Sequence, residues 1–218
     1  MIRAIAYPKT NEDPADVLLG LQPRRGQKML AIGGGGDQGF ALATSAEVHM
    51  IDSCPAQIDV IHIRKDALYD GRTEEFLQQD SYDPTDVYRA SFWREPGRMD
   101  RLRNRLSQVH VSQMNLDDAL KFACEEGKTF DGIYLSNVLG YDTHQTGQDI
   151  YRQLCMVAHC LPKGGRAYVA NHGQLVRRAE TLRNMPSFLP SSMRIERGFS
   201  PRNKGAIRWD PVVYVKQQ

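Results

Sequence analysis

The feature that most constrains this chain is a run of four glycines directly after an apolar stretch. Gly33, Gly34, Gly35 and Gly36 follow residues 28–32, which favour a β-strand, and precede residues 38–45, which are long enough for a helix of about two turns. Glycine permits a tight turn and lets a ligand approach the bare backbone. Together with Gly39, Gly34 and Gly36 also match the G-x-G-x-x-G fingerprint of nucleotide-binding turns. The pattern predicts a strand, a ligand-binding turn and a helix, in that order.

A carboxylate ends the next predicted strand, residues 47–52. This residue, Asp52, lies 19 residues after Gly33. At the end of the second strand of a βαβ unit, a carboxylate can accept hydrogen bonds from both hydroxyls of a ribose. A plain glycine-rich turn followed by a helix-capping aspartate is the alternative. The glycine loop, the carboxylate and the strand order, however, all favour a nucleoside-binding site. We therefore expect a nucleoside cofactor at this turn.

Short β-rich runs alternate with helical patterns along the chain, which is typical of βαβ units and a mainly parallel sheet. Further strands are predicted at 109–111, 130–135 and 166–170, and helices at 55–68 and 150–160. The runs 193–199 and 212–215 predict a terminal antiparallel hairpin at the sheet edge. Residues 69–107 break the alternation. We therefore expect one domain, residues 1–218, with an insertion or lid at 69–107.

Composition excludes several classes of protein. Hydrophobic residues make up 41% of the chain and charged residues 25%, as in ordinary folded domains, and the net charge of +2 is too small to indicate a nucleic acid or membrane partner. The four cysteines form no C-x-x-C pair and no zinc-ligand spacing occurs, so we expect reduced thiols and no metal. Without a predicted signal peptide or membrane span, a cytoplasmic protein is the simplest expectation.

Two later segments resemble the class I S-adenosylmethionine-dependent transferases. They are Phe130-Asp131-Gly132-Ile133 with the following Ser136-Asn137, and Leu161-Pro162-Lys163-Gly164-Gly165-Arg166. The resemblance covers residues 26–171. It implies a Rossmann-like fold, a mostly parallel seven-stranded sheet with an antiparallel C-terminal strand, and S-adenosylmethionine rather than NAD as the cofactor. Methyltransferases of this class usually carry an acidic residue two positions before the first glycine, where this chain has Ala31.

A narrower resemblance is to the 3-amino-3-carboxypropyl transferases related to betaine-lipid synthesis. It is carried by Asn11-Glu12-Asp13-Pro14, by residues 29–36, by Asp52-Ser53-Cys54-Pro55-Ala56-Gln57 and by residues 64–68. The family usually has Asn at the position of Cys54 and a longer insertion, so a lipid substrate is not implied. The resemblance implies transfer of the aminocarboxypropyl group to a nucleophilic small-molecule acceptor, with release of methylthioadenosine. Methyl transfer and a non-catalytic nucleoside-binding or sensing protein are the alternatives.

The motifs and the predicted strand ends together indicate the site residues. The expected cofactor contacts are Glu12, Asp13, Gly33, Gly34, Gly35, Gly36, Gln38, Asp52, Ser53, Gln57, Asn115, Ser136 and Asn137. Candidate general bases follow the predicted strand 130–135, because carboxyl ends of strands line the crevice of an open α/β sheet. These candidates are Tyr141, Asp142 and His144. A solvated polar loop is the alternative for the three bases, and a helix start at Asp13-Pro14 is the alternative for the upstream acids.

Overall fold

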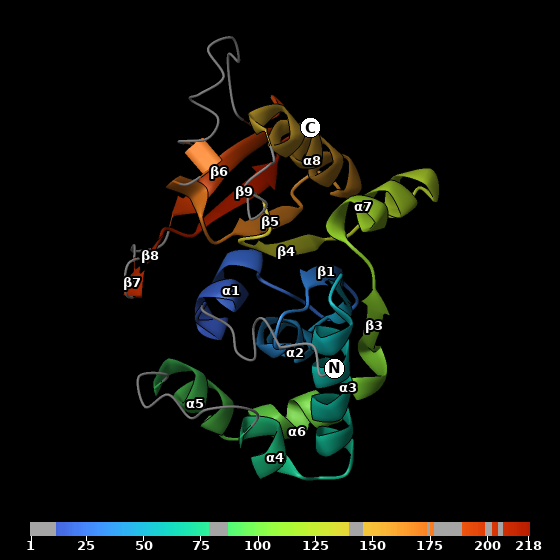
Figure 1. The fold of residues 1–218 in the computed structure, drawn as a ribbon, viewed down its shortest axis with the longest axis vertical. Coiled ribbons are helices and arrows are strands. Elements are labelled where there is room, and N and C mark those ends of the chain that lie inside the picture. The colour runs from blue at the N-terminus through green and yellow to red at the C-terminus, as the bar shows by residue number, and fades with distance from the viewer. Residues whose placement is uncertain are drawn as a thin grey trace. The chain divides into compact units, whose positions relative to one another are not determined.

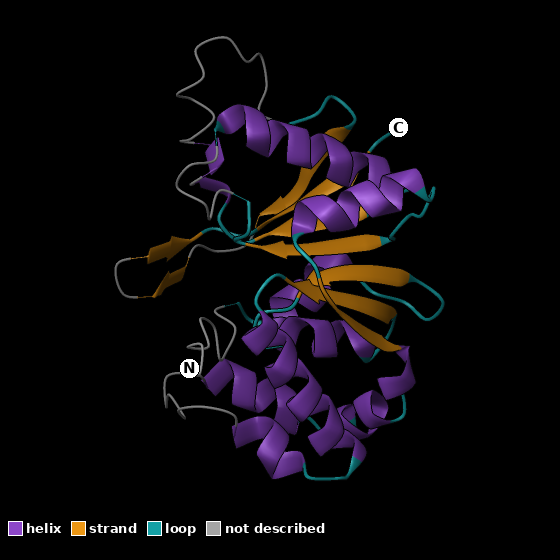
Figure 2. Cartoon of the chain, turned by 45° about the vertical axis from the view of Figure 1, so that its right-hand side comes forward, coloured by secondary structure: helices purple, strands orange, loops and turns teal. Residues whose placement is uncertain are grey.

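Strands and helices alternate along most of the chain, as the sequence predicts. The computed structural model describes residues 12–78, 87–139, 146–173, 175–176, 189–198, 202–204 and 207–218, and the chain divides into two compact units, Met1–Leu116 and Asp117–Gln218. Seven strands form a mixed sheet that is mostly parallel, with antiparallel C-terminal strands (Figures 1 and 2). The predicted α/β fold class is therefore confirmed.

The first unit contains three parallel strands in the order β3-β2-β1. Their bounds are Lys28–Ile32 for β1, Glu47–Asp52 for β2 and Val109–Gln113 for β3. Because the three strands run in the same direction, their carboxyl ends lie at one edge. The loops that follow the strands, which begin with Gly33, Ser53 and Met114, leave from this edge.

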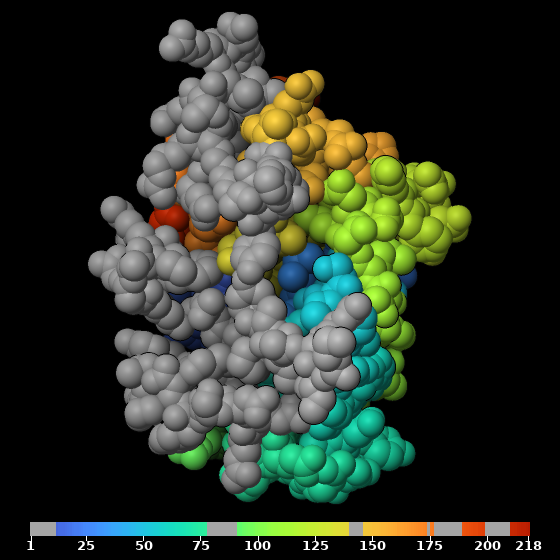
Figure 3. Space-filling view, viewed as in Figure 1, coloured from blue at the N-terminus to red at the C-terminus, as the bar shows by residue number. Residues whose placement is uncertain are grey.

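The helices of the first unit include the segment that breaks the sequence alternation. They are α1 (Pro14–Leu21), α2 (Asp37–Ala43), α3 (Pro55–Tyr69), α4 (Thr73–Gln78), α5 (Val87–Arg94), α6 (Arg98–Arg103) and the short 3-10 helix η1 (Leu106–Gln108). One side of α3 is buried, whereas its other side and α4 reach the surface (cyan to teal in Figure 3). Within the insertion, Phe76, Phe92 and Trp93 are buried and stack edge to face, with ring centroids 5.2 and 4.9 Å apart. These aromatic side chains therefore belong to the core of the unit.

Four strands of the second unit lie in the order β4-β5-β9-β6. Their bounds are Gly132–Ser136 for β4, Arg166–Val169 for β5, Val212–Lys216 for β9 and Met193–Gly198 for β6. The pair β4 and β5 is parallel, whereas β9 runs antiparallel to both of its neighbours, β5 and β6. The predicted antiparallel pairing of the two C-terminal runs is confirmed. A separate two-stranded sheet, β7 (Arg202–Lys204) with β8 (Ile207–Trp209), lies between them in sequence.

These strands are accompanied by the helices α7 (Leu116–Glu125) and α8 (Gly147–Cys160). The start of α8 is fixed by a capping box. The amide of Asp149 donates to Thr146 Oγ1 at 3.2 Å, and the amide of Thr146 donates to Asp149 Oδ2 at 2.9 Å. The helix therefore begins before the apolar pattern at Ile150 from which it was predicted. In the segments that the structure describes, no helix has the length and hydropathy needed to span a bilayer.

Gly39 allows α2 to pack closely on β2. A Cβ at this position would lie 2.1 Å from Met50 Sδ, and both residues are buried. We expect Gly39→Ala to destabilise the protein by about 1–3 kcal/mol, because the overpacking outweighs the higher helix propensity of alanine. Urea unfolding measures the effect. The matched control is Gly198→Ala, since a Cβ there meets nothing within 4 Å; stabilisation by Gly39→Ala would contradict this packing.

Candidate functional site

The glycine loop between β1 and α2 is a tight turn. Gly34 and Gly36 have φ angles of +47° and +88°, which side chains other than glycine rarely adopt. The turn is closed by the amide of Gly36, which donates to the Gly33 carbonyl at 2.7 Å. A Cβ at Gly34 would meet nothing within 4 Å, so open space borders the backbone there. The loop thus presents bare main chain, as the sequence predicts.

Asp52, the last residue of β2, fastens this loop. Its Oδ2 accepts from the amide of Gly34 at 2.9 Å, and its Oδ1 accepts from the amide of Cys54 at 2.9 Å. The side chain is only partly buried. Each carboxylate oxygen has a second lone pair, so both can still accept a hydrogen bond from a ligand. The structure therefore brings the predicted acidic residue and the glycine loop together.

A buried ion pair that the sequence interpretation missed supports the loop. Arg64 of α3 and Asp37 at the start of α2 are fully buried, and Nη2 of Arg64 lies 2.6 Å from Oδ1 of Asp37. The same Oδ1 accepts from Trp93 Nε1 at 3.2 Å, and Arg64 also donates through Nη1 to the carbonyl of Gly35. The guanidinium lies over the ring of Phe76, 4.3 Å from its centroid. These contacts fix the end of the glycine loop and the beginning of α2.

A signal for this ion pair was present in the sequence. Arg64 lies in α3 at helical spacing from Val60, Ile61, Ala67 and Leu68, all of which are buried. An arginine on the apolar side of a helix needs a buried acceptor, because an unpaired buried charge is very costly. The acid that directly follows the glycine loop, Asp37, is that acceptor.

The upstream acidic motif lies next to α2. The side-chain amide of Gln38 donates to the main-chain carbonyl of Glu12 at 2.8 Å, and both residues are buried. Asp13 is the N-cap of α1, where its Oδ1 accepts from the amide of Ala15 at 2.9 Å. The helix-start interpretation therefore describes the position of Asp13, and contact of Glu12 or Asp13 with a cofactor stays a prediction.

Three other predicted contacts follow β2 and β3 at the same strand edge. Ser53 is exposed directly after β2, Gln57 is buried in the first turn of α3, and Asn115 is exposed after β3. The amide of Met114 donates to the carbonyl of Asp52 at 3.0 Å, which keeps the loop after β3 beside the end of β2. The first unit therefore places Asn115 in a loop that touches Asp52.

The remaining predicted residues belong to the second unit. Ser136 ends β4 with a φ of +50°, an uncommon backbone conformation for a residue with a side chain, and its hydroxyl lies 3.4 Å from Asn137 Oδ1. The candidate bases Tyr141, Asp142 and His144 lie outside the residues that the structure describes. Their predicted role therefore stays a prediction.

A polar cluster that the sequence interpretation did not assemble follows β5. Nδ1 of His172 lies 2.7 Å from the hydroxyl of Tyr214, and Asp210 Oδ2 accepts from the amide of Gly173 at 2.6 Å. Burial lowers the pKa of His172 and raises the pKa of Tyr214, which the Asp210 charge raises further. At neutral pH the imidazole is therefore neutral and the phenol protonated, so His172 is in the form that accepts a proton. Tyr214 is on β9, which pairs antiparallel with β5, and His172 follows the end of β5.

No protein-family model and no curated protein matches the chain. Solved structures similar to it include TrmN from Thermus thermophilus, at 17% identity and a TM-score of 0.61 over 98% of this chain and 51% of that one. The N-methyltransferase NodS from Bradyrhizobium japonicum WM9, in complex with S-adenosyl-L-homocysteine, matches at 14% identity and a TM-score of 0.60. The match covers 100% of this chain and 92% of NodS. An rRNA methylase from Streptococcus thermophilus matches at 9% identity and a TM-score of 0.55, over 96% of this chain and 100% of that one.

These similarities define the fold. The chain has the Rossmann-like fold of class I S-adenosylmethionine-dependent methyltransferases, with the glycine loop and Asp52 at the carboxyl ends of its first two strands. The chain spans about half the length of TrmN and nearly the whole length of NodS.

Proposed function

We propose that the chain is a transferase that uses S-adenosylmethionine. The observation that carries the proposal is the Asp52 carboxylate, which is fastened to the glycine loop and partly accessible. A carboxylate at this place, beside bare backbone, suits the ribose of a nucleoside. The likeness to NodS, a protein solved with S-adenosyl-L-homocysteine, supports the same cofactor here.

The residues of the first unit fit such a cofactor in distinct ways. Asp52 would accept hydrogen bonds from the ribose hydroxyls while it still accepts those from the amides of Gly34 and Cys54. The open space at Gly34 would admit the cofactor against the backbone. Bound S-adenosylmethionine supplies an electrophilic carbon beside its sulfonium, so the protein mainly has to position the acceptor and exclude water.

Methyl transfer is the reaction that the comparisons favour. NodS is named an N-methyltransferase and the Streptococcus thermophilus protein an rRNA methylase. We therefore place methyl transfer ahead of the aminocarboxypropyl transfer that the sequence motifs imply. Because the Streptococcus thermophilus protein is named an rRNA methylase, we include RNA as an acceptor class alongside small molecules.

Aminocarboxypropyl transfer is the second candidate, and one structural observation favours it. Ala31 is completely buried at the position where methyltransferases of this class usually carry an acid, so no carboxylate is available there. The backbone of Glu12 is instead held against Gln38, directly after the glycine loop. A different placement of the methionine end of the cofactor would direct a different carbon of the sulfonium toward the acceptor.

Product analysis distinguishes these reactions. We expect incubation with S-adenosylmethionine and a panel of amines, phenols, thiols and RNA to yield S-adenosylhomocysteine and a methylated acceptor, as measured by mass spectrometry. Methylthioadenosine with an acceptor that has gained an aminocarboxypropyl group would establish the second candidate. Binding of S-adenosylhomocysteine in calorimetry without any product would favour a non-catalytic nucleoside-binding protein, and absence of binding would contradict the proposed cofactor.

A further inference from the structure

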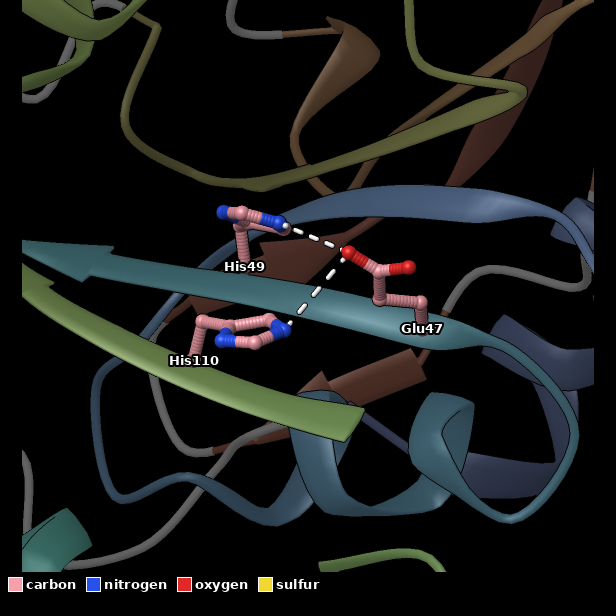
Figure 4. Close-up of side chains that lie close together, drawn as sticks. All are labelled: Glu47, His49 and His110. Atoms are coloured by element: carbon pink, nitrogen blue, oxygen red, sulfur yellow. Dashed lines mark hydrogen bonds and ion pairs between the residues drawn. The ribbon is translucent and has the colours of Figure 1, made fainter. Parts of the chain in front are cut away.

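Three side chains that can bind a metal ion lie together on one side of β2 and β3. Glu47 and His49 are two residues apart on β2 and therefore lie on the same face of the strand. His110 is the residue of β3 that pairs with His49 in the parallel register. Figure 4 shows both imidazole rings directed toward the carboxylate of Glu47. The register brings together residues whose sequence spacing shows no metal motif.

The separations of the ligand atoms suit one small cation. Oε1 of Glu47 lies 3.2 Å from Nε2 of His49 and 3.5 Å from Nε2 of His110. Ligands of a tetrahedral zinc ion with bonds near 2.0–2.1 Å are separated by about 3.3 Å. The three ligand atoms all lie within 4.8 Å of one another, so only a small rotation of the rings is needed to close the set. The ring centroids are already 4.6 Å apart and inclined by 35°.

Exposure and charge also suit an ion. The side chains of His49, His110 and Glu47 are 42%, 48% and 28% exposed, so an ion can enter and water can complete its coordination. Burial lowers the pKa of His110, the neighbouring His49 and Lys65 lower it further, and Glu47 opposes the change. The neutral imidazole, which is the form that binds metals, is thereby favoured at His110.

We propose that Glu47, His49 and His110 form a binding site for a divalent transition-metal ion of the zinc type. Two imidazoles and one carboxylate select such an ion over magnesium or calcium, which prefer sets made entirely of oxygen ligands. The ion would link β2 to β3, an end strand of the three-stranded order β3-β2-β1.

The metal site is separate from the proposed cofactor site. His49 precedes Asp52 by three residues, or about 10 Å along an extended strand. An ion held by Glu47, His49 and His110 would therefore stabilise the pairing of β2 and β3 and would not contact the transferred group. This inference does not depend on the proposed function.

Calorimetric titration of the full chain with Zn²⁺ at neutral pH tests the proposal. We expect one ion to bind per chain, no binding of Mg²⁺, and a loss of about 100-fold or more in zinc affinity for His110→Ala, because one of three protein ligands is removed. The matched control is His62→Ala, which removes an exposed histidine of α3 outside the cluster and should leave the zinc affinity unchanged. Glu47→Gln, which keeps the size of the side chain, should also weaken binding.

A second measurement identifies the ligands, since the free cysteines offer thiolates that also bind zinc. Long-range proton–nitrogen spectra of the imidazoles should show Zn²⁺ shifting the Nε2 signals of His49 and His110 and leaving His62 unchanged. Equal zinc affinity of His110→Ala and the wild type would overturn the proposal. A zinc titration that leaves the Nε2 signals of His49 and His110 unshifted would also overturn it. The three side chains would then be a carboxylate hydrogen-bonded between two imidazoles without a metal-binding role.

Discussion

Replacing Arg64 by methionine is expected to lower the free energy of unfolding by about 3–5 kcal/mol, the usual cost of breaking a buried ion pair. Arg64 and Asp37 have no exposed side-chain surface, and the variant leaves the Asp37 carboxylate buried with Trp93 Nε1 still 3.2 Å from Oδ1. The variant also removes a donor to the carbonyl of Gly35, so the glycine loop loses its support from α3. We expect weaker cofactor binding as a consequence.

Urea unfolding measures this effect, and the chain offers a matched control. Arg72 forms ion pairs with Asp70 and Glu75 at the surface, so Arg72→Met should leave the free energy of unfolding nearly unchanged. Adding Asp37→Asn to Arg64→Met should recover part of the lost stability, because the buried carboxylate charge that has lost the Arg64 guanidinium is then removed as well. If Arg64→Met and Arg72→Met prove equally mild, the buried pair does not stabilise the fold as described.

The parts of the fold that were predictable are those encoded over short stretches of sequence. β1 covers the predicted residues 28–32, and β2 covers 47–52, because each is a β-rich run between turn-forming residues. The glycine loop was equally clear, since it follows a strand and precedes a helix. The strand order made the position of Asp52 beside that loop predictable as well.

Two helices, α7 and α8, were missed or shifted in the sequence interpretation. α7 was not predicted from the sequence, although Leu116, Ala119, Leu120 and Ala123 are buried at helical spacing. The charged residues Asp117, Asp118 and Lys121 stand between these apolar positions, so the helix is amphipathic and its signal was present in the sequence but was overlooked. A helix start that depends on polar capping, such as Thr146 at α8, also precedes the first apolar residue that reveals the helix.

Contacts between distant residues could not be predicted from one sequence. His49 and His110 lie on separate strands, and only the register of β2 with β3 brings their rings together. For Asp37 and Arg64, which are 27 residues apart, the sequence signalled that Arg64 needs a buried acceptor but did not specify which acid supplies it. Such partners depend on which strands pair and how α3 packs, which local patterns do not specify.

Asp52→Ala is expected to weaken binding of S-adenosylhomocysteine by about 1.5–3 kcal/mol, or roughly 10-fold to 150-fold, because a charged acceptor for the ribose hydroxyls is lost. Calorimetry measures the change. The control is Asp59→Ala, which removes an exposed carboxylate from α3 and should leave the affinity as it is. Because Asp52 also accepts from the amides of Gly34 and Cys54, the variant loosens the glycine loop, and affinity alone does not separate the two effects.

A comparison of two ligands makes that separation. A loosened loop weakens S-adenosylhomocysteine and its 2′-deoxy analogue to the same extent, whereas loss of the contact to the 2′-hydroxyl weakens the ligand that carries this hydroxyl more than the analogue that lacks it. We therefore expect the wild type to prefer S-adenosylhomocysteine over the analogue, and Asp52→Ala to bind the two almost equally. If the preference survives in the variant, another residue reads the ribose. Asp52 would then only fasten the glycine loop, and the proposed function would lose the observation that carries it.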